Sequence, residues 1–148
     1  MRVSRYLRSP AVLAGGVAIV LCACSGGAPP SSGSFPEAAL TTVMSEGASF
    51  RVEVRTAPEQ PLVVGLDSVE LTVTDAVTGA PVDGLSVEMT PWMPSMGHGT
   101  SVVPILDAQG HGRYVFTNVS LFMPGEWQLR TTFSGAIDDR VAPVFDVP

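Results

Sequence analysis

The sequence contains no lysine, so its eight basic residues are all arginine, against fourteen aspartate and glutamate residues. The formal net charge at pH 7 is −6, and the chain after position 23 holds five arginines and all fourteen acidic residues, a formal charge of −9. Such an acidic surface repels nucleic acid and anionic lipid headgroups and mildly favours cations. We therefore expect no nucleic-acid partner.

Cysteine is nearly absent, since Cys22 and Cys24 are the only two. They end an apolar run, residues 10–23, that follows three arginines and is too short to span a bilayer comfortably, as in a signal peptide. The segment Leu21-Cys22-Ala23-Cys24 resembles the lipobox of bacterial lipoproteins, which implies cleavage before Cys24 and lipidation of that residue. Cys22 is a poorer candidate, because the bulky Leu21 would precede the cleavage point. The alternative is an ordinary secretory peptide with incidental cysteines.

The lipobox resemblance implies that several acyl chains on Cys24 anchor the protein to a membrane more firmly than one chain would. Ser25, rather than aspartate, after that cysteine favours the periplasmic side of the outer membrane, or the cell surface in a bacterium with one membrane. With Cys22 removed and Cys24 acylated, no thiol remains. This excludes disulfides, zinc–cysteine sites and cysteine nucleophiles in the mature chain.

Sustained helical periodicity is also lacking, and this bears on the domain organisation. Residues 1–23 are interpreted as the lipoprotein signal peptide. Residues 24–47 are interpreted as the lipidated N-terminus and a flexible linker, because residues 25–34 are rich in glycine, serine and proline. Residues 35–47 show no sustained period and are expected to be irregular. Residues 48–148 then form one domain.

The domain instead shows short apolar runs, several of them alternating with polar residues, separated by turn residues. Asp67-Ser-Val-Glu-Leu-Thr-Val-Thr74 is the cleanest example, with Val69, Leu71 and Val73 expected to face inward. Strands are expected at residues 50–56, 62–64, 67–74, 85–89, 100–106, 111–119, 126–133 and 140–147, the last at a sheet edge because of Pro143. The pattern predicts an all-β fold, an immunoglobulin-like antiparallel β-sandwich of about seven strands.

Soft metal ligands are concentrated between two of these strands. The stretch from Trp92 to Thr100 contains Met93, Met96 and His98, and its proline and glycines predict a loop. Thioether sulfur suits Cu(I), and imidazole suits several transition metals. A methionine-rich loop can also be the lid of a hydrophobic core, so core and ligand roles are equally open for Met93.

Hairpin geometry selects among the remaining candidates. If the turn after residue 106 centres near Ala108, His111 lies beside Ile105. The roughly seven strand residues between Ile105 and His98, at about 3.3 Å each, then separate the two histidines by roughly 20 Å. One metal ion cannot bind both histidines, so His111 is interpreted as a solvated turn residue. The same geometry places Met123 at the His98 end of the sandwich.

The candidate copper ligands are therefore Met93, Met96, His98 and Met123. In extended backbone, the two-residue spacing of Met96 and His98 points both side chains to one side. Met89 continues an inward-facing series and is expected in the core.

Enzymatic motifs are absent: the sequence has no nucleophile elbow, no phosphate-binding glycine loop and no His-Glu-x-x-His pattern. Asp67, Asp107 and the adjacent Asp138 and Asp139 are interpreted as solvated turn residues. We expect no catalytic residues and no enzyme.

Three linked motifs resemble the YtkA-like (FixH-related) domain of exported bacterial proteins. They are Met93-Pro-Ser-Met96-Gly-His98-Gly, Gly112-Arg-Tyr114-x-Phe116 and Phe122-Met123-Pro-Gly125-x-Trp127-x-Leu129. The resemblance covers about residues 51–133 and implies a small periplasmic β-sandwich associated with copper handling or cytochrome oxidase assembly. By position, the family's Met-Pro-x-Met-x-His segment falls on Met93, Pro94, Met96 and His98, and its Met-x-Gly-x-Trp segment falls on Met123, Gly125 and Trp127. Its Gly-x-Tyr segment, Gly112 and Tyr114, is expected to be structural.

Two functions remain open at this stage. The first is an envelope lipoprotein that binds copper as Cu(I) and passes it to an accepting partner or buffers it. The second is a metal-free immunoglobulin-like module whose loop or sheet edge contacts another envelope protein. This chain departs from members of the family that are anchored by a transmembrane helix, because a lipidated cysteine is expected to serve as its anchor. This departure argues against direct assembly with an oxidase membrane subunit.

Overall fold

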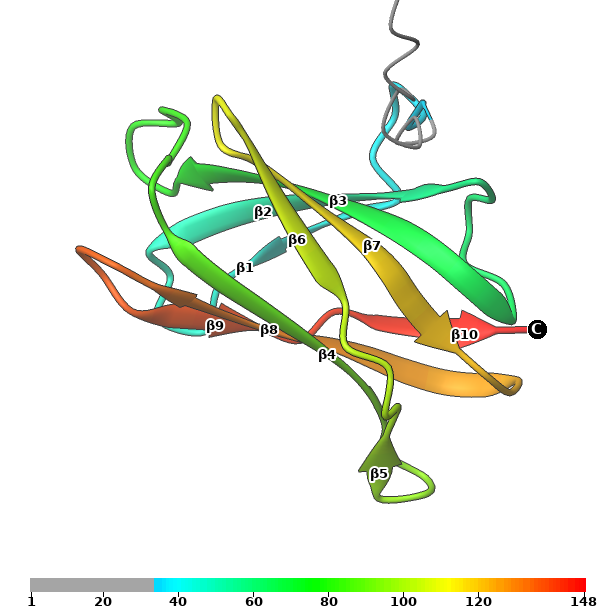
Figure 1. Cartoon of the computed structure of the whole chain (residues 1–148). Coiled ribbons are helices and arrows are strands. Elements are labelled where there is room, and N and C mark those ends of the chain that lie inside the picture. The colour runs from blue at the N-terminus through cyan, green and yellow to red at the C-terminus, as the bar shows by residue number, and fades with distance from the viewer. Residues whose placement is uncertain (1–33) are drawn as a thin grey trace, which may run out of the picture.

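The computed structural model describes residues 34–148 as two packed antiparallel sheets of five strands each and no helix (Figure 1). The predicted signal peptide, Cys24 and the part of the predicted linker up to residue 33 lie outside the described residues. Within residues 34–148, no helix is long and apolar enough to cross a membrane.

The first sheet has the strand order β1–β2–β3–β7–β6. Its strands are Thr41–Met44 (β1), Phe50–Ala57 (β2), Gly65–Asp75 (β3), Arg113–Leu121 (β7) and Ile105–Gly110 (β6). The second sheet has the order β10–β8–β4–β5, and β9 also pairs with β8. Its strands are Val144–Val147 (β10), Gly125–Ser134 (β8), Ser86–Met93 (β4), His98–Gly99 (β5) and Asp139–Val141 (β9).

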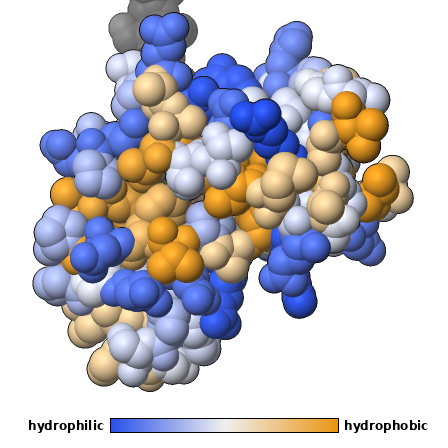
Figure 2. Space-filling model, turned by 180° about the vertical axis from the view of Figure 1, so that it is seen from behind, coloured by the Kyte–Doolittle hydropathy of each residue, from blue (hydrophilic) through white to orange (hydrophobic). Residues whose placement is uncertain are grey.

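The core lies between the two sheets and follows from the two-residue alternation of the strands. In β3, the predicted inward residues Val69, Leu71 and Val73 are each at most 1% exposed. Across the sandwich, Phe133 of β8 meets Phe50 of β2 edge to face, with ring centroids 5.6 Å apart. The predicted all-β antiparallel sandwich is confirmed. On the outer face shown in Figure 2, apolar side chains gather in patches between hydrophilic ones.

Residues 34–148 form ten strands rather than about seven, for local reasons. Residues 41–44, expected to be irregular, form β1 because they pair with β2 from Thr41↔Val54 to Met44↔Arg51. Residues 62–64 do not form the expected strand, although Leu62 is fully buried. The predicted last edge strand is present but divided at residues 142–143, which separate β9 from β10.

The β6–β7 hairpin is shifted along the chain from its predicted position. Ile105 pairs with Thr117 and Ala108 with Tyr114, so the turn lies at residues 110–112 rather than near Ala108. His111, with φ 54°, occupies this turn and is exposed, as expected of a turn residue. The predicted pairing of His111 with Ile105 is wrong.

Candidate functional site

The predicted Trp92–Thr100 loop is a tight hairpin between β4 and β5. Met93 is the last residue of β4 and pairs with His98 of β5. The turn is closed by hydrogen bonds from the Met96 and Gly97 amides to the Met93 carbonyl, at 3.2 and 3.0 Å. Gly97 has φ 67°, a left-handed conformation that glycine adopts without steric cost. The hairpin therefore fixes the backbone between the two exposed candidate metal ligands, Met96 and His98.

An aromatic chain joins this hairpin to the turn between β7 and β8. The His98 ring stacks on Phe122, with centroids 6.0 Å apart and planes 8° apart. The rings of Phe122 and Trp127 are in turn packed in a T-shaped arrangement, with their centroids 5.2 Å apart. The Trp127 indole Nε1 donates a 3.0 Å hydrogen bond to the Met123 carbonyl oxygen. These contacts bring the two segments to the same end of the sandwich, which we call the methionine–histidine pole and define by Met96, His98 and Met123.

The four methionine and histidine candidates differ in exposure. Met96 is 55% exposed and His98 is also exposed. Met123 is partly buried and packs against the core. Met93 is only 3% exposed, and its Cε lies 2.7 Å from the position that a Cβ on Gly125 would occupy. Met93 is thus a core side chain directly beneath the pole, and Met89 is in the core as predicted.

The His98 imidazole has one ring nitrogen free among the described residues. Its Nδ1 lies 3.2 Å from the Gly99 carbonyl oxygen, while Nε2 has no hydrogen-bond partner in residues 34–148. Met96 lies in the turn and not in extended backbone. The expectation that its two-residue spacing from His98 sets both side chains on one side therefore does not apply. His111 lies at the β6–β7 turn, whereas His98 contacts Phe122, just beyond the other end of β7.

The family model for YtkA-like proteins matches residues 46–132, more than half of the chain. The chain belongs to the YtkA-like family. The resemblance read from its motifs is thereby confirmed, and the match includes the whole methionine–histidine pole. The comparisons with curated proteins and with solved structures gave no match.

The YtkA-like domain has a buried acid that the sequence reasoning assigned to a turn. Asp67 is 3% exposed and lies in β3, beside a register shift against β7. Its Oδ2 is buried and has no hydrogen-bond partner in the described part of the chain. Burial, and to a lesser extent the nearby charge of Glu59, raise the pKa of Asp67 to about 6. The signal was available, because Asp67 continues the inward alternation of Val69 and Leu71.

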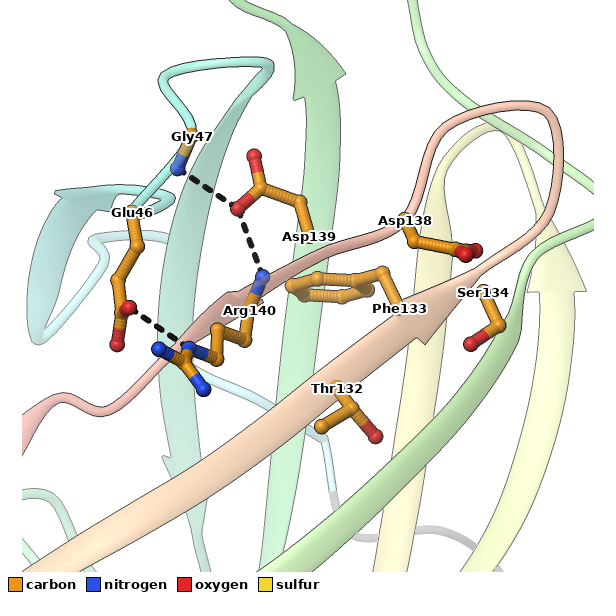
Figure 3. Close-up of a pocket in the computed structure, with 8 residues that line it drawn as sticks. All are labelled: Glu46, Gly47, Thr132, Phe133, Ser134, Asp138, Asp139 and Arg140. Carbon is orange, nitrogen blue, oxygen red and sulfur yellow. Dashed lines mark hydrogen bonds and ion pairs between the residues drawn. The ribbon is translucent and has the colours of Figure 1, made fainter.

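A second acid, Asp139, is a structural clamp and not the solvated turn residue that was predicted (Figure 3). Its carboxylate accepts hydrogen bonds from the Ser45 hydroxyl at 2.6 Å and from the Gly47, Ser49 and Arg140 amides at 2.8–3.2 Å. Partial burial alone would raise the pKa of Asp139, but these hydrogen bonds outweigh it and hold the pKa well below its usual range. The adjoining hollow of about 540 Å³ is lined in part by Glu46 and Arg140, which form an ion pair.

No group of three or more histidine, cysteine, aspartate or glutamate side chains within residues 34–148 could hold a metal ion. The donors gathered at the methionine–histidine pole are thioether sulfur and imidazole nitrogen. This set matches the preferences of a soft cation such as Cu(I) better than those of Mg²⁺ or Ca²⁺, which require oxygen ligands.

Proposed function

We propose that this YtkA-like protein is an exported, lipid-anchored, non-enzymatic protein that binds copper as Cu(I) and buffers it or passes it to an accepting protein. The observation that carries the proposal is the meeting of two segments, the β4–β5 hairpin and the β7–β8 turn, at one pole. They bring two thioethers and one imidazole to the same end of the domain. Copper handling in support of cytochrome oxidase assembly fits the family resemblance.

The residues of the pole would have different roles toward the ion. Met96 is 55% exposed and is suited to capturing copper from a carrier. His98 is held by its stacking on Phe122 and offers Nε2. Met123 lies in a turn whose carbonyl is fixed by Trp127. Bound Cu(I) would supply a soft, exchangeable cation, and ligand exchange at an exposed site allows transfer without redox chemistry.

The test is a Cu(I) titration of the purified protein under reducing conditions, in competition with a chromophoric Cu(I) chelator. Wild type should bind about one equivalent, and the double variant Met96→Leu, His98→Ala should lose this binding. The matched control is the double variant Met44→Leu, His111→Ala, which removes one exposed methionine and one exposed histidine elsewhere on the domain. Unchanged affinity in the pole variant, or equal loss in the control, would overturn the proposal.

Met93 provides a further arm of this titration. Because it is buried in the core, Met93→Leu should keep Cu(I) affinity and cost less than about 1.5 kcal/mol of stability, as volume-conserving core substitutions do. Loss of copper binding in a stably folded Met93→Leu variant would instead make Met93 a ligand.

Anchoring and location form the second part of the proposal. Acylated Cys24 would hold the domain on the periplasmic side of the outer membrane, or on the cell surface in a bacterium with one membrane. The acidic chain has formal charge −6, which favours cations and does not favour nucleic acid as a partner.

A metal-free interaction module is the second candidate function, favoured by one observation at the same pole. Met96 and Phe122 are 55% and 44% exposed, so an apolar, adaptable surface faces outward there. A domain of this kind would show no Cu(I) affinity in the titration and would bind an envelope protein through these side chains. The copper titration therefore separates the two functions.

A further inference from the structure

The strand β4 has a free edge along most of its length. It pairs with β8 from Ser86↔Ser134 to Trp92↔Gln128, whereas on its other side β5 covers only Trp92 and Met93. Among the described residues, no strand pairs with residues 86–91 on that side. Free strand edges expose backbone donors and acceptors that can template another strand.

Hydrogen bonding across β8 shows which backbone groups face the free edge. The Leu129 amide donates to the Pro143 carbonyl, on the side of β8 away from β4. Leu129 and its partner in β4, Pro91, therefore form a pair that shares no hydrogen bonds. Along an antiparallel ladder, such pairs alternate with hydrogen-bonded pairs. By that alternation, Val87 and Met89 direct their N–H and C=O groups away from β8.

The close approach of β5 supports the same assignment. A Cβ on Gly99 would lie 2.5 Å from the Pro91 carbonyl oxygen, so this carbonyl points toward β5 and the free edge. None of the hydrogen bonds outside the strand ladders, within residues 34–148, reaches the backbone groups of Val87 or Met89. An incoming strand would find two N–H donors and two C=O acceptors here.

An apolar groove of about 330 Å³ runs beside this edge, between the two sheets. It lies between β4 of one sheet and the edge strand β6 of the other, which are near each other in Figure 1. Six of the residues that line it are apolar, namely Val87, Met89, Val103, Pro104, Leu106 and Phe116, and the other two are Glu88 and Thr90. Alternate side chains of an added strand would point into this groove.

Charge indicates the chemistry of the other face of such a strand. Glu88 lies midway along the free edge and borders the groove, but it is exposed, unlike the buried Val87 and Met89 on either side of it, and it makes no ion pair with any described residue. A second copy pairing antiparallel about this residue would set two Glu88 carboxylates opposite each other, which is unfavourable. A basic residue opposite Glu88 would be favourable by the same rule.

We propose that the free edge of β4 binds an extended segment of another polypeptide as an added strand. The segment has apolar residues at alternate positions, which enter the groove, and a lysine or arginine opposite Glu88. The interface is separate from the methionine–histidine pole, and copper binding has no part in it.

The first experiment measures binding of a fluorescein-labelled seven-residue peptide, alternating valine with lysine or threonine, by fluorescence anisotropy. Two further peptides carry N-methyl groups on either the odd or the even residues. Because only one set of amides faces β4, one methylated peptide should bind like the parent and the other should lose more than about tenfold in affinity. No binding of the parent at millimolar protein, or equal binding of both methylated peptides, overturns the proposal.

The second experiment tests Glu88 by charge exchange. Glu88→Lys should lower the affinity for the lysine-containing peptide about five- to tenfold. It should raise the affinity for a peptide with glutamate in place of lysine, since a cross-strand charge pair contributes up to about 1 kcal/mol. The matched control is Glu126→Lys, the same charge change at an exposed position of β8 paired with β10. Equal effects of both variants would overturn the assignment of Glu88. If analytical ultracentrifugation shows a dimer that the peptide does not dissociate, the groove binds a second copy of this chain, and the proposed partner is overturned.

Discussion

Asp67 occupies a position at which the alternation of β3 normally places an apolar side chain. Val69 and Leu71, which follow Asp67 at two-residue intervals along β3, are fully buried core residues. Asp67 is buried with them, and its Oδ2 has no hydrogen-bond partner within residues 34–148. Burial, and secondly the nearby charge of Glu59, disfavour the charged form and raise the pKa of Asp67 to about 6. The ionised carboxylate of Asp67 is therefore expected to lower the stability of the folded state at neutral pH.

The sign of the resulting pH dependence follows from linkage. The pKa of Asp67 is about 6 in the folded state and near the ordinary aspartate value of 3.8 in the unfolded state. Between these values the folded state binds more protons, so stability rises as pH falls from above 6 toward 4. Asp139 acts in the opposite direction, because its pKa is lowered, but its contribution is lost only in stronger acid.

We predict that the free energy of unfolding of wild type is higher at pH 5 than at pH 8, by on the order of 1–2 kcal/mol. Asp67→Asn removes the buried charge, so it should raise stability at pH 8 and flatten this slope. Urea unfolding at pH 5, 6.5 and 8 measures both effects. Asp107→Asn, at an exposed position of β6, should keep the wild-type slope. A slope unchanged by Asp67→Asn would contradict the assignment.

At the scale of elements, Asp139 ties the two sheets together. It stands at the start of β9, in the second sheet, and accepts hydrogen bonds from Ser45, Gly47 and Ser49 in the β1–β2 turn of the first. The Ser45 hydroxyl also accepts a 2.8 Å hydrogen bond from the Phe50 amide. Loss of the carboxylate would leave several donors of one turn without their acceptor.

We predict that Asp139→Ala lowers the free energy of unfolding by about 2 kcal/mol, since each lost or orphaned hydrogen bond contributes on the order of 1 kcal/mol. Chemical denaturation at pH 7 measures the change. Asp146→Ala, in β10, is the control and should stay within about 0.5 kcal/mol of wild type. Equal stability of the two variants would show that the clamp is dispensable.

The strands also show where the alternation of apolar and polar residues predicts secondary structure correctly. β2, β3 and β8 alternate cleanly, and the structure gives each of them close to its predicted range. β1 and β5 could not be predicted in this way, because four and two residues are too few for a period and both depend on their neighbours for pairing. The β6–β7 hairpin was displaced because residues 110–112 adopt the left-handed conformations that close the turn there.

At the scale of the whole molecule, the proposed function requires the domain to be tethered where copper is exchanged. The lipobox resemblance assigns the anchor to Cys24 and not to Cys22. This assignment concerns residues outside the described range and is open to a direct chemical test.

We predict that cells fed an alkyne fatty acid label the wild-type protein, because the acylated cysteine takes up the probe. Cys24→Ser should abolish the label, and Cys22→Ser, the matched control, should keep it. In-gel fluorescence after coupling of the alkyne to a dye measures the label. Label retained by Cys24→Ser, or lost in Cys22→Ser, would refute the assignment.

The sequence by itself determined the fold class and the family, because strand alternation and the spaced Met, His and Trp motifs are local in the chain. It also predicted that Met123 and His98 lie at the same end, since a hairpin fixes which strand ends meet. Only the tertiary structure decided that Met93 is buried beneath the pole while Met96 is exposed. It alone showed the free edge of β4, because strand order and side-chain exposure depend on contacts between segments distant in the chain.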